Sequence, residues 1–256
     1  MTLAAIRILD DRRDNDGIKK RKCALGAKLE EHMEEFHYTP VNGHAVARIH
    51  GRQFLLAPGL PYSIAKRPLL LEGEKIGVEN KVIGLTVEDL SPRVGIELDG
   101  VLGANVSDRF VVNIDPRDYR LEFDQYQKYF PISVPVDNLG GAANWHVSIG
   151  GRRARALLDL GTKLSLVHPD LVEGLEPAGR ETEVLGYIGP CEMEVYSLPV
   201  LVDREAVHLR FAAVPPEIAL RMELANVQAI IGYELLDHYA LSLAMSEGEL
   251  SLDPLH

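Results

Sequence analysis

An acidic residue in a short apolar loop is the side chain of this sequence best placed to do chemistry. Asp159 lies in the stretch ALLDLGTKLSLV (156–167), and an earlier stretch, FLLAPGLPYSIA (54–65), aligns with it without gaps. The loop residues are Ala57, Pro58 and Gly59 in the first copy and Asp159, Leu160, Gly161 and Thr162 in the second. Two carboxylates held close together share a proton, so that one activates water while the other donates. The sequence offers half of such a pair.

A second repeat follows each loop. The segment GVLGANVSDRFVVNIDPRDYRLEF (100–123) aligns without gaps with AIIGYELLDHYALSLAMSEGELSL (229–252), and Gly103 pairs with Gly232. Two motifs that recur in the same order indicate an internal duplication. We therefore predict two related units in one chain.

These motifs resemble the retropepsin-like (clan AA) aspartic protease family. In that family two apolar residues precede Asp-Thr/Ser-Gly, and a later apolar-apolar-Gly segment, here 101–103 and 230–232, packs under the loop. The resemblance covers about residues 41–256 and implies an all-β fold, with two pseudo-symmetric lobes in a pepsin-like bilobal arrangement. The expected units are an N-terminal arm with a short helix (1–40), a first lobe (41–125) and a second lobe (126–256).

The loops depart from the family motif at the residues that do the chemistry. Each lobe of the family supplies one aspartate, whereas Ala57 carries no proton. Pro58 and Leu160 replace the hydroxyl residues that brace the pair, and Pro58 also lacks a backbone N–H. Asp159 is then either the surviving half of a dyad or a turn residue whose carboxylate accepts backbone N–H groups. Gly59 and Gly161 are structural on both interpretations.

A glycine-rich segment of the second unit is the candidate for a flap. Residue 54 aligns with 156 but residue 100 aligns with 229, so the second unit has extra residues between its motifs. They include GYIGPCEMEVYSLP (186–199), which reads as a β-hairpin whose tip residues are Gly186, Tyr187, Ile188 and Gly189. In the resembled family a hairpin flap there covers the substrate. The first unit is shorter, so its flap is expected to be reduced or absent.

The functional expectation is a catalytically inactive pseudoprotease that binds a peptide or protein segment in the inter-lobe cleft by strand addition. The alternative is an active aspartic endopeptidase, in which Asp159 pairs with a second carboxylate from elsewhere or with Asp159 of another chain. Whether the protein is an enzyme stays open, as does its oligomeric state.

Composition argues against several other classes. A net charge of −11 disfavours nucleic-acid binding, and no apolar run approaches the roughly 20 residues of a membrane helix. Cys23 and Cys191 do not suggest a disulfide framework, so a cytoplasmic location is expected. No metal or cofactor is predicted, because the nine histidines show no paired ligand spacing and nucleotide-binding glycine motifs are absent. Ser165 lacks the context of a serine nucleophile.

The elements expected around the loops are mostly strands. Residues 44–57 predict a hairpin that turns at 50–51, and the second unit predicts hairpins at 150–151 and 247–248. The segment KVIGLTVEDL (81–90) is read as β-rich, ELLDHYAL (234–241) as a short helix and 124–131 as the bridge between units. Residues 24–36 suit a helix, and the basic cluster 19–22 is either a solvated charge run or a targeting or phosphate-binding patch.

Overall fold

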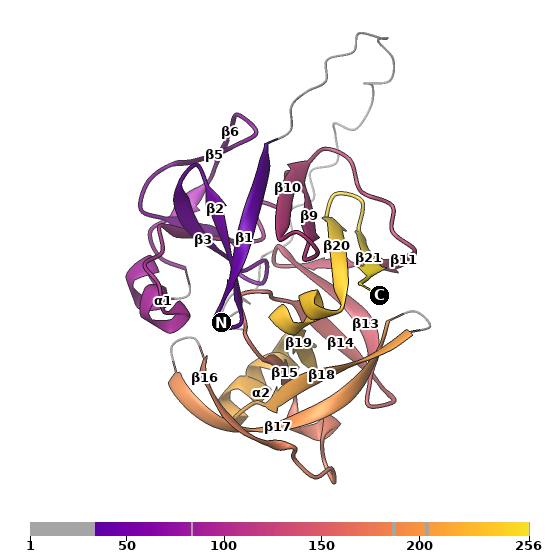
Figure 1. The fold of residues 1–256 in the computed structure, drawn as a ribbon. Coiled ribbons are helices and arrows are strands. Elements are labelled where there is room, and N and C mark those ends of the chain that lie inside the picture. Colours follow the sequence, from indigo (N-terminus) through magenta and orange to yellow (C-terminus); the bar gives the residue numbers. More distant parts are fainter. Residues whose placement is uncertain (1–33, 83, 186–187, 203–204, 256) are drawn as a thin grey trace.

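The protein is mostly β, with two main sheets and two α-helices among the residues that the structure describes (Figure 1). This computed structural model describes residues 34–255 except 83, 186–187 and 203–204. The first half contains β1 (Glu35–Val41), β2 (His44–Ile49), β3 (Arg52–Leu56), β4 (Ser63–Ala65), β5 (Leu69–Leu71), β6 (Glu74–Ile76), β7 (Val78–Glu79), α1 (Val87–Val94), β8 (Gly100–Leu102), β9 (Val111–Asp115) and β10 (Arg120–Asp124).

The second half follows the same order with a longer insertion. It contains β11 (Ile132–Pro135), β12 (Asp137–Leu139), β13 (Ala142–Ile149), β14 (Arg152–Leu158), β15 (Ser165–Val167), the 3-10 helix η2 (Pro169–Leu171), β16 (Gly179–Leu185), β17 (Gly189–Val202), β18 (Glu205–Ala213), α2 (Pro216–Leu224), β19 (Ala229–Ile231), the 3-10 helix η3 (Tyr233–Asp237), β20 (Tyr239–Ala244) and β21 (Glu249–Pro254).

Equivalent strands pair in equivalent ways. Strand β3 is parallel to β8, as β14 is to β19, and β4 runs antiparallel to β8, as β15 does to β19. A further parallel partner follows in each half, β7 beside β4 and β18 beside β15. The hairpins predicted at 50–51, 150–151 and 247–248 are confirmed by the pairings β2–β3, β13–β14 and β20–β21. The two halves therefore share one order of strand pairing.

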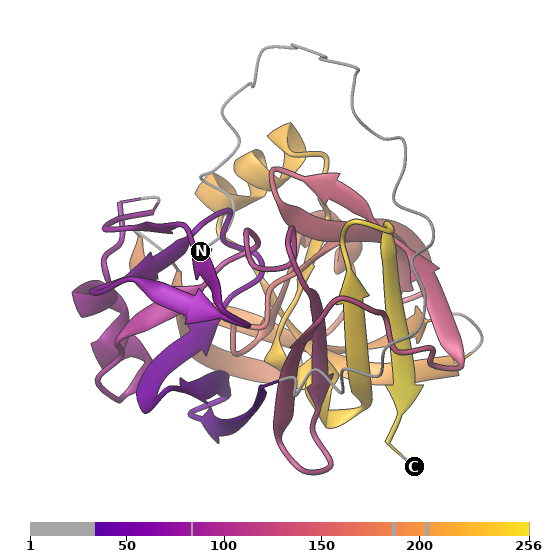
Figure 2. The same cartoon turned by 90° about the horizontal axis from the view of Figure 1, so that it is seen from above.

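One sheet joins the two halves. Hairpin β20–β21 lies beside hairpin β9–β10 (Figure 2), and β20 pairs with β9 in the register Asn113↔Ser242, Val112↔Leu243 and Ile114↔Leu241. In the aligned repeats residues 112, 113 and 114 correspond to 241, 242 and 243. Exchanging the halves therefore returns the same pairs, so a local twofold axis passes through the Asn113–Ser242 pair.

The linker between the halves lies against this axial pair. Gln127 Nε2 donates to Ser251 Oγ over 3.0 Å, and the Lys128 backbone N–H donates to Ser242 Oγ over 3.2 Å. These bonds satisfy polar groups on one face of the shared sheet. The predicted bridge 124–131 is thus fixed to the strands that it connects.

The second half closes into a barrel whereas the first stays open. Strand β13 pairs with both β14 and β17, through Ser148↔Leu201 and Ile149↔Val200, so the sheet from β13 to β17 meets itself. In the described first half the sheet ends at β7, and β5–β6 form a separate two-stranded sheet. The strands from β13 to β17 therefore form a closed ring, and β12 and β16 extend beyond it as edge strands.

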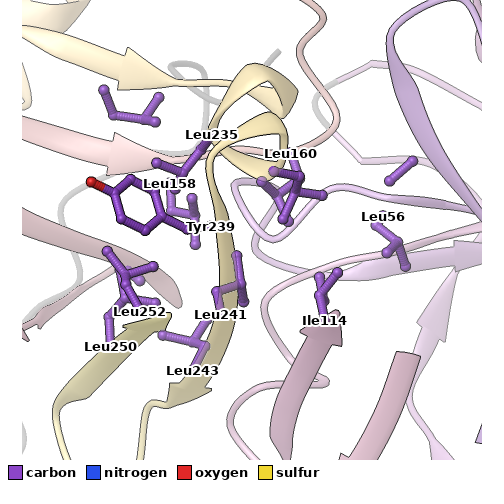
Figure 3. Close-up of a cluster of buried hydrophobic side chains, with 14 of the residues drawn as sticks. Leu56, Ile114, Leu158, Leu160, Leu235, Tyr239, Leu241, Leu243, Leu250 and Leu252 are labelled. Carbon is purple, nitrogen blue, oxygen red and sulfur yellow. The ribbon is translucent and has the colours of Figure 1, made fainter. Parts of the chain in front are cut away.

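A continuous apolar core runs through both halves. The buried cluster contains Leu56 and Ile114 from the first half and Leu158, Leu160 and Leu241 from the second. Figure 3 shows these side chains between the loops and the shared sheet. This cluster joins the two halves, and each half also has a smaller buried cluster of its own.

The structure corrects three predicted elements. Residues 35–36 of the expected helix 24–36 lie in strand β1, because Phe36 and Tyr38 alternate with exposed neighbours and the strand pairs with both β2 and β10. Residues 1–33, which hold the rest of that helix and the basic cluster, lie outside the described residues. The segment 81–90 leads into helix α1 rather than a strand, since Thr86 and Asp89 form a capping box. The helix expected over 234–241 is the 3-10 helix η3, and its end belongs to β20.

Candidate functional site

The two aligned loops are held by the same hydrogen bonds. The backbone N–H of Ala57 donates to Leu102 O over 2.9 Å, and that of Asp159 donates to Ile231 O over 2.9 Å. Each loop then turns back on itself, with Leu60 N–H donating to Ala57 O and Thr162 N–H donating to Asp159 O. Ala57 and Asp159 therefore occupy equivalent positions, as the alignment predicted.

A serine beneath each loop ties it to the later glycine. Gly103 N–H donates to Ser63 Oγ and Gly232 N–H donates to Ser165 Oγ, each over 3.0 Å. A methyl group added to Gly232 would lie 2.6 Å from the carbonyl oxygen of Thr162. This close approach explains the glycine and gives Ser165 a structural role, which its alignment with Ser63 signals in the sequence.

The two loops face each other where Gly161 of the second loop meets Ala57 of the first. A methyl group added to Gly161 would lie 2.6 Å from Ala57 Cβ and 3.2 Å from Asp159 Oδ1. The methyl group of Ala57 therefore lies against the backbone that follows Asp159. Both Ala57 and Asp159 are 0% exposed. The structure thus brings the expected catalytic position and its degenerate partner together, in a site closed to solvent.

The carboxylate of Asp159 accepts hydrogen bonds from its own loop. Gly161 N–H donates to Oδ1 and the Thr162 hydroxyl donates to Oδ2, each over 3.2 Å. This is the geometry of a turn aspartate whose oxygens cap nearby donors. The first loop, which reads Ala57-Pro58-Gly59, holds no acid that could share a proton with it.

The positions of the two family hydroxyls are filled by apolar contacts. Pro58 and Leu160 line a cavity of about 30 Å³ together with Leu56, Leu158, Ile114 and Leu241. In Figure 3 Leu160 lies between Leu158 and Leu56. Pro58 and Leu160 therefore contribute apolar packing where the resembled family has hydroxyl groups, and their side chains make no hydrogen bonds.

A histidine that no sequence motif singles out reaches across from the first half. His44 Nδ1 lies 3.1 Å from Gly161 O, and because a carbonyl oxygen only accepts, Nδ1 must carry the proton. Burial lowers the pKa of His44, an effect that Lys163 reinforces and that Glu183, the Gly161 carbonyl and Asp159 oppose. His44 follows a two-residue turn and has no partner near it in sequence, so only the fold reveals its contact.

The hairpin β16–β17 closes the other side of the loop. Glu183 Oε2 accepts the Leu164 N–H over 3.4 Å, and Glu181 lies 3.6 Å from Lys163 Nζ. Of the predicted flap residues, Gly186 and Tyr187 lie outside the described residues. Ile188 N–H donates to Leu185 O, and Gly189 has φ +94°, so the described ends of this segment form the expected hairpin turn. The corresponding hairpin of the first half, β5–β6, has two three-residue strands.

A small pocket lies where the halves meet, and we call it the junction pocket. Its volume is about 20 Å³, and its lining includes His44, Leu55 and Arg93 from the first half and Gly161, Thr162 and Glu183 from the second. Such a volume holds about one water molecule.

Each half also presses a hairpin turn on the loop of the other. A methyl group added to Gly43, in the β1–β2 turn, would lie 2.5 Å from Lys163 Cγ. One added to Gly141, in the β12–β13 turn, would lie 3.3 Å from Ala104 Cβ and 3.6 Å from Pro61 O. Lys163 and Pro61 each lie four positions after Asp159 and Ala57 in their loops. These reciprocal contacts obey the local twofold symmetry.

The described residues show neither a metal cluster nor a membrane-spanning helix. Among the described residues no group of three or more His, Cys, Asp or Glu side chains is arranged to hold a metal ion. No helix in that part of the chain is long and apolar enough to span a membrane.

Comparison with known proteins yields a distant structural similarity. No protein-family model and no curated protein matches the sequence. Among solved structures, the chain is similar to the simian foamy virus (mac) protease in solution, at 18% identity and a TM-score of 0.27, covering 35% of this chain and 86% of that one. It is also similar to the foamy viral protease-reverse transcriptase in complex with an RNA/DNA hybrid, at 14% identity and a TM-score of 0.27, covering 40% of this chain and 11% of that one. The similarity is to a retropepsin-like fold over about a third of the chain.

Proposed function

We propose that this protein is a catalytically inactive member of the retropepsin-like fold, with two pseudo-symmetric lobes in a pepsin-like arrangement, and that it binds an extended peptide or protein segment between them. One observation carries the catalytic part of the proposal. Ala57 occupies the position equivalent to Asp159 and packs against Gly161, so one loop carboxylate stands where the chemistry needs two.

The surroundings of Asp159 support the same conclusion. Its two oxygens already accept from Gly161 and Thr162, and the side chain is fully buried. A general base must reach the proton that it removes. Pairing with Asp159 of another chain would need both buried carboxylates to become exposed, so the geometry disfavours the active-endopeptidase alternative.

Edge strand β16 supports the binding part of the proposal. In the described sheet β16 pairs only with β17, and it runs beside the Asp159 loop through the Glu183–Leu164 contact. An exposed strand edge accepts an extended segment by main-chain hydrogen bonds, and neighbouring pockets then select side chains. The closed junction pocket must widen for this to happen, because about 20 Å³ cannot hold a peptide side chain.

Two assays test the proposal. Cleavage of a pooled library of extended decapeptides is followed by mass spectrometry from pH 3 to pH 8, for the wild type, Asp159→Asn and the surface control Asp118→Asn. We expect no cleavage by any of them. Cleavage that disappears only in Asp159→Asn would establish an aspartic peptidase and overturn the catalytic part.

Binding is tested with the same peptides. The peptides that the protein retains from the library are then titrated by calorimetry. They should show saturable binding to the wild type, and Asp159→Asn should bind them as well. A library from which nothing is retained at any pH from 4 to 8 would overturn the binding part.

A further inference from the structure

We propose that His44 is a latch that holds the junction pocket closed at neutral pH, and that acidification releases it. The proposal deepens the proposed function, on which it rests, by assigning a regulator to the same site. It predicts that the protein exchanges a closed form for an open form as the pH falls.

The latch is a contact between the halves rather than within one. His44 begins strand β2 of the first half and donates from Nδ1 to the carbonyl of Gly161 in the second. The turn before it, Asn42-Gly43, has φ values of +49° and +79° and packs on Lys163. Moving the β1–β2 hairpin away from the Asp159 loop breaks both contacts at once.

Strand β16 of the second half also contacts the Asp159 loop beside the junction pocket. Glu183 of β16 accepts the Leu164 N–H, and Leu185 and Glu183 line the junction pocket opposite Arg93 and Val94 of α1. The pocket is therefore bounded by the β1–β2 turn, by α1 and by Glu183 and Leu185 of β16. His44 contributes the hydrogen bond that joins the first of these to the loop.

Charged groups face His44 from each element packed against it. The carboxylates of Asp159, on the loop, and Glu183, on β16, favour a protonated imidazole, whereas Lys163 on the loop disfavours it. Arg93 of α1 lines the same pocket and adds a further positive charge beside it. Burial outweighs the two carboxylates, so the pKa of His44 lies below its ordinary value of 6.5.

The sign of the pH effect follows from that direction. In the open form the imidazole meets water and titrates near 6.5, whereas in the closed form it stays neutral to lower pH. Closure is therefore fully favoured above the open-form pKa and is lost as the pH falls below 6.5. If the closed form never took up the proton, the opening equilibrium would rise about 30-fold between pH 7.5 and pH 5.0. About 30-fold is thus the upper limit for one histidine.

Hydrogen exchange measures the opening without any peptide. Exchange of the amides in residues 159–166, corrected for the intrinsic effect of pH, should rise between pH 7.5 and pH 5.0 in the wild type, by at most about 30-fold. His44→Asn keeps an N–H donor near the position of Nδ1 and cannot titrate, so its exchange should stay flat. His146→Asn, an exposed histidine on β13, is the matched control and should respond as the wild type does.

The outcomes separate the latch from other pH effects. His168 is also buried, but it precedes η2 and contacts Glu223 of α2 rather than the Gly161 carbonyl, so the His44→Asn comparison removes its contribution. The latch would be overturned if amide exchange in the wild type did not change with pH, or if exchange in His44→Asn rose as it does in the wild type. If His44→Asn does not fold, the imidazole signals of the wild type decide by NMR, since the latch requires His44 to titrate below 6.5 in step with the exchange.

Peptide binding is measured separately at the same two pH values. Opening in acid without retention of any library peptide would leave the latch standing and remove the proposed function. Binding of equal affinity at pH 7.5 and pH 5.0, with no change in exchange, would leave the proposed function standing and remove the latch. Binding that strengthens in acid for the wild type but not for His44→Asn supports both.

Discussion

Replacing Ala57 with aspartate would restore the missing carboxylate, and the structure predicts that it destabilises the protein. Ala57 is fully buried and its Cβ touches the Gly161 backbone, so the new carboxylate enters a packed space beside Asp159. Overpacking of this kind costs about 1–3 kcal/mol. Charge adds to that cost, because a like charge and burial together raise the pKa of a carboxyl by about two units, worth roughly 3 kcal/mol at neutral pH.

The charge contribution has a defined pH dependence. A carboxyl whose folded-state pKa is raised costs stability above its unfolded pKa of about 3.9, and the cost disappears as the pH falls below that value. We therefore expect Ala57→Asp to lose about 4–6 kcal/mol of unfolding free energy at pH 7.5 and about 1–3 kcal/mol at pH 4. Urea denaturation at the two pH values measures both losses.

Two control variants separate volume from charge. Ala57→Asn has nearly the same shape without the charge, so its loss should match the acidic value for Ala57→Asp at both pH values. Ala57→Asp with Asp159→Asn removes the like-charge repulsion and should recover part of the loss at pH 7.5. If Ala57→Asp and Ala57→Asn were equally stable at pH 7.5, the carboxylates would not interact, and the facing geometry of the loops would be refuted.

Three further changes test the loop frame by the same denaturation measurement. Ser165→Ala leaves the buried Gly232 N–H without its acceptor and should cost about 1–3 kcal/mol; an unchanged midpoint would show that this hydrogen bond is dispensable. Gly161→Ala places a methyl group 2.6 Å from Ala57 Cβ and should cost at least as much as ordinary overpacking, about 1–3 kcal/mol, with neutrality counting against the contact. Leu160→Thr removes apolar contacts around the cavity of about 30 Å³ that Pro58 and Leu160 line, and it should destabilise by about 2–4 kcal/mol without producing peptidase activity, which a cleavage assay checks.

The sequence predicted the frame of the site better than its surroundings. Ungapped loop repeats placed Ala57 opposite Asp159, and the matching hydrogen bonds of the two loops confirm it. The β9–β20 register reproduces the alignment of the second repeat at Asn113 and Ser242. This succeeded because the residues of each repeat are fixed by pairing in a sheet, where a shift by one residue would turn every side chain to the wrong face.

The features that the sequence did not predict depend on contacts between distant segments. Residues 35–36 look helical with the acidic run before them, but they pair with β10, which lies far along the chain. His44 carries no local signal, because its role comes from Gly161 in the other half. Helix α1 was a different case, since the capping box of Thr86 and Asp89 is visible in the sequence.

The sheet shared by the two halves has a consequence for synthesis of the chain. Strand β9 is made early, but its outer partner β20 follows roughly 120 residues later, a delay of about 6–25 s at ordinary ribosome speeds. During that time the nascent first half presents an unpaired edge of apolar strand to its neighbours, which is the geometry that seeds aggregation. Chains cut short before Tyr239 should therefore precipitate, although they contain every strand of the first half. Hairpin β20–β21 thus covers the strand edge that β9 would otherwise leave unpaired.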